Sequence, residues 1–299
     1  MANLRLFFMA SRPFSFTASV IPVLVGTLLA AVDEFSWWKA LLALVGSIFI
    51  HAGTNYVNDY FDHVKGADNE KSLGPAGFIQ KGVVQPRVIL IAGIISFAIG
   101  GGIGLILCAV TSWSLIWLGV ASVLAGFLYT GAPVHLAYIG LGEVTVFIFM
   151  GPIMVVGAYF VQTNAWDWQP VVASLPIAFL VTAILQANNL RDIDHDREAG
   201  KRTIATAIGR HAANWEMYAL LIGAYISLIV AAAVQALPWP ALIALATAPF
   251  VRPIVRVVAT ATNPKKLNLA LFQTIQLHMR FGALMIAGLG FYWALEGLT

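Results

Sequence analysis

Long apolar runs separated by short polar breaks fill most of the chain. Nine of these runs, each of about 20 residues, are long enough to cross a lipid bilayer as helices. They lie near residues 15–32, 38–58, 87–109, 112–130, 139–161, 170–188, 212–234, 237–259 and 275–296. The pattern predicts an all-α integral membrane protein in which about nine transmembrane helices form a bundle. We expect residues 1–299 to form a single transmembrane domain.

The composition supports a membrane protein. Hydrophobic residues make up 60% of the chain and charged residues only 10%, whereas soluble domains usually contain about 25% charged residues. Residues 1–14 carry two arginines and no cleavage-like site. We therefore expect the first apolar run to be a membrane helix and not a removed signal peptide. The lone cysteine, Cys108, cannot form a disulfide within the chain.

The lysines and arginines predict how the helices face the membrane. With nine spans, sixteen of the seventeen lysines and arginines fall on the side of the N-terminus, and only Lys39 falls on the other side. Because positively charged loops stay on the cytoplasmic side, the N-terminus is predicted to be cytoplasmic and the C-terminus to lie outside. The net charge of +3 is spread over these loops. It requires no nucleic-acid partner.

Two connections on the predicted cytoplasmic side are rich in acids and amides. In each, an amide and two carboxylates are spaced so that they share one helix face, at i, i+4 and i+7 or at i, i+4 and i+8. The first connection contains Asn55, Asn58, Asp59, Asp62 and Lys65, and the second contains Asn188, Arg191, Asp192, Asp196 and Lys201. We call these the first and second acidic segments.

Stacked carboxylates near a membrane repel one another, and a multivalent cation removes that repulsion. Ligands that are all oxygen suit Mg²⁺, which prefers carboxylates together with substrate phosphates. The flanking lysines and arginines would neutralise the remaining charge of a diphosphate. The spacing thus predicts a Mg²⁺–diphosphate site, because acids that begin inside a membrane span are usually functional. The alternative explanation is that these residues are charged simply because they lie in solvated loops.

The same residues carry a resemblance to a known family. The segments NYVNDYFDHVKGAD and NNLRDIDHDREAGKRTIA resemble the two aspartate-rich motifs of the UbiA superfamily of intramembrane prenyltransferases. Within it, the chain is most similar to the branch that prenylates 1,4-dihydroxy-2-naphthoate. Supporting segments are SRPFSFTASVIPVLVGT at 11–27, GPAGFIQKGVVQPR at 74–87 and LYTGAPVHLAYIGLGEVTVFIFMGP at 128–152. The hydroxybenzoate branch usually has a further aspartate where this chain has Gly66.

The resemblance implies a nine-helix bundle around a central cavity, capped by both acidic segments on the cytoplasmic side. It implies two Mg²⁺ ions that bind with a polyprenyl diphosphate, and a small aromatic acid as the acceptor. One ion would be held by Asn55, Asp59 and Asp62. The second would be held by Asp192 and Asp196, with Asn188 in support.

Further roles follow from the resemblance and the site chemistry. Lys65, Arg191 and Lys201 would neutralise the leaving diphosphate, and Asn58 would contribute to substrate binding. Tyr129 could stabilise an allylic cation with its ring face, or it could be an interfacial tyrosine. Arg12 could pair with an acidic acceptor, or it could be a positive-inside anchor. Glu143 could belong to the polar network of the cavity.

Three alternatives remain open from the sequence. The acceptor could be another aromatic acid such as 4-hydroxybenzoate or homogentisate. The chain could be a cation-coupled transporter, although transporters place their acids near the middle of the membrane. It could also be a passive prenyl-lipid binding protein. In each case we expect membrane lipid around the chain and no obligatory protein partner, with the active site at the cytoplasmic face of a bacterial cytoplasmic membrane.

Overall fold

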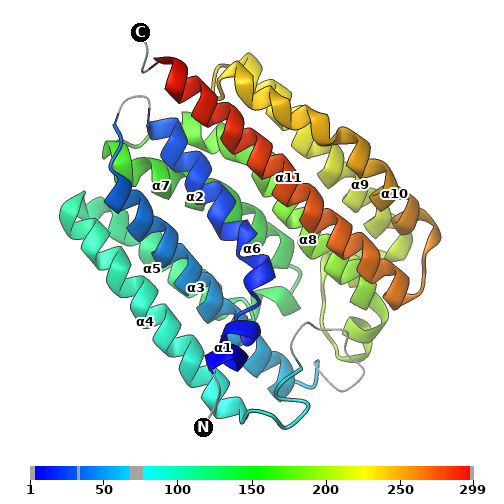
Figure 1. Cartoon of the computed structure of the whole chain (residues 1–299). Coiled ribbons are helices and arrows are strands. Elements are labelled where there is room, and N and C mark those ends of the chain that lie inside the picture. Colours follow the sequence, from blue (N-terminus) through cyan, green and yellow to red (C-terminus); the bar gives the residue numbers. More distant parts are fainter. Residues whose placement is uncertain (1–3, 32–33, 68–76, 297–299) are drawn as a thin grey trace.

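The structure is a computed structural model that describes residues 4–31, 34–67 and 77–296. Residues 68–76 lie outside the described part, and they include Lys71 and the start of the 74–87 segment. Long helices run side by side through the bundle, and the two chain ends lie at opposite ends of it in Figure 1. The α-helices are α1 (Leu4–Ala10), α2 (Thr17–Ala30), α3 (Trp37–Val64), α4 (Pro86–Val110), α5 (Ile116–Leu128), α6 (Gly142–Ile148), α7 (Met154–Thr163), α8 (Gln169–Glu198), α9 (Ile204–Ala233), α10 (Val251–Thr260) and α11 (Pro264–Glu296).

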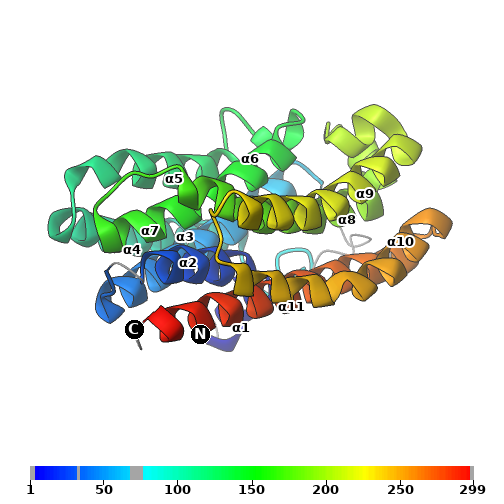
Figure 2. The ribbon, with the colours of Figure 1, turned by 90° about the horizontal axis from the view of Figure 1, so that it is seen from above.

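Short stretches of tighter or wider helix join these elements. They are the 3₁₀ helices η1 (Pro13–Ser15), η2 (Trp113–Leu115), η3 (Leu136–Tyr138) and η5 (Trp239–Phe250), and the π-helical turn η4 (Phe149–Ile153). The neighbours α3 and α4, α8 and α9, and α2 and α7 pack against one another. Seen from above in Figure 2, α2 and α11 lie side by side, and α10 packs against the other end of α11.

Helical structure covers most of each predicted apolar run, and seven of the described helical segments are long and apolar enough to cross a membrane. The protein is therefore an all-helical, multi-pass membrane protein. The run at 139–161 is divided into α6, η4 and α7, and Pro152 lies in the π-helical turn. Proline lacks the N–H that an α-helix needs at that point, so this span is not one regular α-helix. The run at 237–259 is also divided, into η5 and α10.

Small residues bring the helices close together. A Cβ atom on Gly26 would lie 2.2 Å from the carbonyl oxygen of Val155, so α2 and α7 can approach this closely only with glycine there. A Cβ atom on Gly100 would lie 3.0 Å from the carbonyl oxygen of Gly46, at the contact of α4 with α3. Close backbone approach through glycine is a usual way for helices to pack in membranes.

The two helices that carry the acidic segments continue beyond their apolar runs. Helix α3 ends at Val64 and α8 ends at Glu198, so the acids of both segments lie on helical turns. The ends of these two helices lie at the same end of the bundle, at the lower right of Figure 1. The ring nitrogen Nε2 of His195 is 2.7 Å from the carbonyl oxygen of Ala67, which brings the two segments into contact.

Candidate active site

Asn55 begins the first acidic segment and is held in one orientation by the N-terminal part of the chain. Its side-chain nitrogen donates to the carbonyl oxygen of Ser11 at 2.8 Å and to the hydroxyl of Ser15 at 3.2 Å. The side chain of His51, one turn earlier on α3, contacts the same Ser15 hydroxyl at 3.1 Å. Both amide hydrogens of Asn55 are thereby used, and its oxygen is the atom left to accept a ligand.

The acids that follow Asn55 contact residues from elsewhere in the chain. Asp59 forms an ion pair with Arg12, a residue between α1 and η1 that has a positive φ of 58°. Asp62 accepts a hydrogen bond of 2.7 Å from the hydroxyl of Tyr138. Burial lowers the pKa of the adjacent Lys65, and the nearby Asp62 carboxylate opposes this effect.

Arg191 organises the second acidic segment. Its guanidinium donates to both carboxylate oxygens of Asp192, at 2.7 and 2.5 Å, and to the side-chain oxygen of Asn188 at 2.7 Å. It also donates to the side-chain oxygen of Asn268 on α11, at 2.9 Å. The Arg191 side chain is only 4% exposed. A buried guanidinium with this bidentate geometry fixes its partners strongly.

Asp196 lies one turn beyond Asp192 and is almost fully buried. One carboxylate oxygen is 3.5 Å from the ammonium of Lys201. The other, Oδ2, is buried and has no hydrogen-bond partner among the described residues. Because a buried oxygen without a partner costs free energy, this atom is suited to accept a cation or a donor from a bound molecule.

The oxygen ligands at these positions fit Mg²⁺. Asp196 Oδ2 and the Asn55 side-chain oxygen are hard oxygen ligands of the kind that Mg²⁺ prefers. Within the described residues, no three His, Cys, Asp or Glu side chains lie close enough together to hold a metal ion by themselves. Substrate phosphates would have to complete the coordination, as they commonly do for Mg²⁺.

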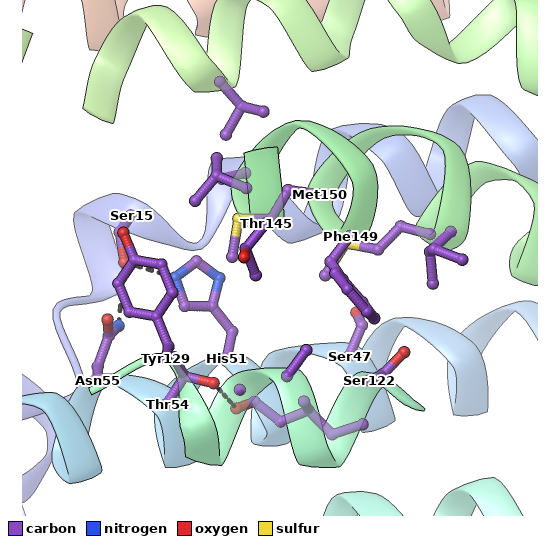
Figure 3. Close-up of a pocket in the computed structure, with 18 of the residues that line it drawn as sticks. Ser15, Ser47, His51, Thr54, Asn55, Ser122, Tyr129, Thr145, Phe149 and Met150 are labelled. Carbon is purple, nitrogen blue, oxygen red and sulfur yellow. Dashed lines mark hydrogen bonds between the residues drawn. The ribbon is translucent and has the colours of Figure 1, made fainter. Parts of the chain in front are cut away.

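A cavity of about 730 Å³ opens beneath the two acidic segments. Along α3 its lining extends from Asp62 to Ala43, a distance of roughly 28 Å at the 1.5 Å rise of an α-helix. Figure 3 shows His51, Asn55 and Tyr129 close together in this cavity, with Phe149 farther along it. The acidic end is polar, and the remainder is lined mainly by aliphatic side chains and glycines.

Most of the predicted site residues line this cavity. The exceptions are Asp59, Asp192 and Asp196, which pair with cations that line the cavity, and Lys65, which contacts the ring of Tyr138. Arg12, Tyr129 and Glu143, whose positions the sequence left open, all line it.

Comparison with known proteins identifies the family. Residues 19–294 match the UbiA prenyltransferase family. The chain belongs to the UbiA prenyltransferase family. It is 34% identical to 1,4-dihydroxy-2-naphthoate octaprenyltransferase of Bacillus subtilis over 93% of this chain and 90% of the relative. It is 33% identical to a Drosophila melanogaster UbiA prenyltransferase domain-containing protein 1 homolog, over 95% of this chain and 79% of the relative.

A solved UbiA structure has the same fold. The UbiA homolog from Archaeoglobus fulgidus bound to DMAPP and Mg²⁺ superposes with a TM-score of 0.63, at 17% identity, over 94% of this chain and 99% of that one. The predicted family and the prediction of an enzyme are confirmed, and so is the UbiA-like helical fold. The individual site residues remain predictions.

The structure of this UbiA chain also places residues in the site that sequence reasoning missed. Tyr138 and Thr130 come from the connection between α5 and α6, where Thr130 donates to the side-chain oxygen of Asn58 at 2.7 Å. Asn268 lies near the start of α11, far from either segment in sequence. The segment LYTGAPVHLAY resembles the family, but nothing in its spacing indicates a contact with the acids.

Proposed function

We propose that the protein transfers a polyprenyl group from polyprenyl diphosphate to 1,4-dihydroxy-2-naphthoate, with loss of CO₂ and diphosphate, in menaquinone or phylloquinone synthesis. The observation that carries this proposal is the meeting of two acidic segments at the polar end of a long, mainly apolar cavity. A diphosphate suits the polar end and a polyprenyl chain suits the apolar part. The similarity to the Bacillus subtilis enzyme supports dihydroxynaphthoate as the acceptor.

The acidic segments would hold two Mg²⁺ ions together with the diphosphate. Asn55, Asp59 and Asp62 would hold one, and Asp192 and Asp196 the other, with Asn188 in support. When bound, the metal stabilises negative charge on the diphosphate oxygens as the bond to the prenyl carbon breaks. The Archaeoglobus fulgidus homolog bound to DMAPP and Mg²⁺ supports Mg²⁺ as the metal that binds with a prenyl diphosphate.

The cations of the site would bind and neutralise the leaving group. Arg191 and Lys201 line the cavity, and Lys65 lies over the same Tyr138 ring as Lys201. Asn58 would assist substrate binding next to them. Their charges would offset the charge that develops on the diphosphate, which a preorganised site can stabilise strongly.

Beneath the two acidic segments, the prenyl carbon would meet the acceptor ring in a part of the cavity from which apolar walls exclude water. Tyr129 lines this part of the cavity and would present its ring to the allylic cation. The ring carbon that carries the carboxylate would form the new bond to the prenyl carbon, and the electron pair of the broken bond to the carboxylate would return to the ring as CO₂ leaves. Arg12, which lines the cavity and contacts Asp59, would orient the acceptor carboxylate before it leaves.

We propose that nine spans form one domain in a bacterial cytoplasmic membrane, with the N-terminus and active site cytoplasmic and the C-terminus outside. Helices α5 and α11 would join the seven candidate spans. Cysteines introduced at Lys65 and at the loop residue Asn164 test this orientation. An impermeant thiol reagent applied to intact cells should label the second and spare the first, and the reverse would refute the orientation.

The decisive experiment is an acceptor panel. Purified protein receives a polyprenyl diphosphate, Mg²⁺ and, in turn, dihydroxynaphthoate, 4-hydroxybenzoate or homogentisate, and mass spectrometry identifies the product. We expect the prenylated naphthalene. The Drosophila melanogaster relative makes another acceptor the second candidate, and a product from another ring alone would establish it. Diphosphate released only with Mg²⁺ and acceptor would exclude a passive lipid binder and a transporter.

A further inference from the structure

Tyr138 lies where the two acidic segments meet. It ends η3 in the connection between α5 and α6, and it is 9% exposed. Its hydroxyl donates a 2.7 Å hydrogen bond to the Asp62 carboxylate of the first segment. Its ring centroid is 4.0 Å from the ammonium of Lys65 and 5.6 Å from the ammonium of Lys201. One side chain therefore contacts charged groups from both segments.

The backbone around Tyr138 is attached to the second segment as well. The N–H of Arg202 donates to the Tyr138 carbonyl oxygen at 3.2 Å, and Ile139 forms an isolated parallel bridge with Arg202. On the other side, the N–H of Ala137 donates to the carbonyl oxygen of Tyr129 at 2.8 Å. These bonds limit the positions that the Tyr138 ring can take.

The two kinds of contact have different physical effects. A phenol that donates to one carboxylate oxygen of Asp62 directs the other oxygen elsewhere, which orients the carboxylate. Lysine ammonium groups sit on flexible stems, and an aromatic ring face attracts them by a cation–π interaction. Holding two ammonium groups near one ring orders them before an anion arrives, which reduces the ordering that binding must otherwise supply.

We propose that Tyr138 is a positioning residue that joins the two acidic segments, orienting Asp62 through its hydroxyl and Lys65 and Lys201 through its ring for a metal–diphosphate group. The proposal rests on the proposed function only for the identity of that group. It does not depend on which aromatic acceptor is used.

Two substitutions separate the hydroxyl from the ring. Tyr138→Phe removes only the hydroxyl, and Tyr138→Leu removes both. Binding of geranyl diphosphate to the purified full-length chain is measured by calorimetry at increasing Mg²⁺, without acceptor. A charged hydrogen bond contributes enough for a change of about tenfold. We expect Tyr138→Phe to need about tenfold more Mg²⁺ for half-maximal binding, and to match the unmodified chain when Mg²⁺ is saturating.

Tyr138→Leu should also weaken diphosphate binding at saturating Mg²⁺, by about fivefold to tenfold for two lost cation–π contacts. The KM for the aromatic acceptor should stay unchanged in both variants. Tyr218→Phe and Tyr218→Leu on α9 are matched controls, since Tyr218 contacts Trp215 and lies outside the site. Both controls should bind diphosphate as the unmodified chain does.

A Mg²⁺ dependence of Tyr138→Phe equal to that of the unmodified chain would overturn the proposal. So would a loss of kcat in both variants with unchanged Mg²⁺ and diphosphate binding, which a purely structural role would produce. If Tyr138→Leu fails to fold, Tyr138→Phe still decides. An unmodified chain that binds diphosphate but prenylates no aromatic acid would refute the proposed function and leave the Tyr138 test valid. An unmodified chain that binds no diphosphate would refute both.

Discussion

The sharpest test of the active site compares two aspartates on the same turn of α8. Asp196 is 4% exposed, and its Oδ2 atom is buried without a hydrogen-bond partner among the described residues. Asp194 points the other way, with its side chain 71% exposed and paired at the surface with Arg197 and Arg210. Changing each to asparagine keeps the size of the side chain and removes its charge. The two variants thus differ in which face of the helix loses a carboxylate.

The expected magnitudes are far apart. If Asp196 is a metal ligand, its loss removes an interaction that strengthens as the diphosphate gains charge. Removing one such preorganised contact typically costs about 100-fold to 1,000-fold in kcat, which is about 2.7–4 kcal/mol in the activation barrier. The ion pairs of Asp194 are at the surface, and such pairs contribute about 0–1 kcal/mol to stability. Asp194→Asn should therefore leave kcat within about twofold of the unmodified enzyme.

The assay measures kcat and KM for a polyprenyl diphosphate at several Mg²⁺ concentrations, with thermal unfolding in detergent as the control for folding. Excess Mg²⁺ should restore part of the activity of Asp196→Asn if the substitution weakens metal binding. The assignment would be refuted if both variants lost activity equally, because the acids would then act as a general surface charge. It would also fail if Asp196→Asn kept full activity at limiting Mg²⁺.

Three further outcomes are expected. Chelation by EDTA should abolish prenyl transfer, and added Mg²⁺ should restore it, whereas activity that persists after chelation would contradict a metal-dependent site. Ser15→Ala should raise the Mg²⁺ concentration needed for half-maximal activity about fivefold. The reason is that the Asn55 amide loses one hydrogen-bond acceptor, worth about 1 kcal/mol. The control Ser114→Ala, far from the site, should leave this Mg²⁺ concentration unchanged. Gly26→Ala should lower the stability measured by thermal unfolding by about 1–3 kcal/mol, because its Cβ would lie 2.2 Å from a carbonyl oxygen of α7. The control Gly101→Ala should leave stability unchanged, because the space around Gly101 is open.

The helical pattern of this chain was predictable because membrane helices satisfy their backbone hydrogen bonds internally. Each apolar run could therefore be assigned without knowledge of its neighbours. The same local rule placed Asn55 and Asp59 on one face of α3, and both are buried there. The interruption at Phe149–Ile153 was not predicted, although Pro152 was a visible signal for it.

The contacts between segments could not be predicted in the same way. The pairs Asp62 with Tyr138 and Arg191 with Asn268 join residues that lie 76 and 77 positions apart. Their formation depends on how helices and connections pack in three dimensions. No periodicity in the sequence reports that packing. The orientation of the Asn55 amide could not be predicted for the same reason, since its partners Ser11 and Ser15 precede it by a whole membrane span.

The ion pairs change how the acidic segments should be understood. From spacing alone, the stacked carboxylates looked like anions that repel until a metal arrives. In the structure, Asp59 contacts Arg12, Asp192 contacts Arg191 and Asp196 contacts Lys201. These cations offset part of the repulsion between the carboxylates. A Mg²⁺ ion bound by these carboxylates would therefore compete with the three cations, and a bound diphosphate would pair with the cations so displaced. Metal and diphosphate should consequently bind more tightly together than either does alone.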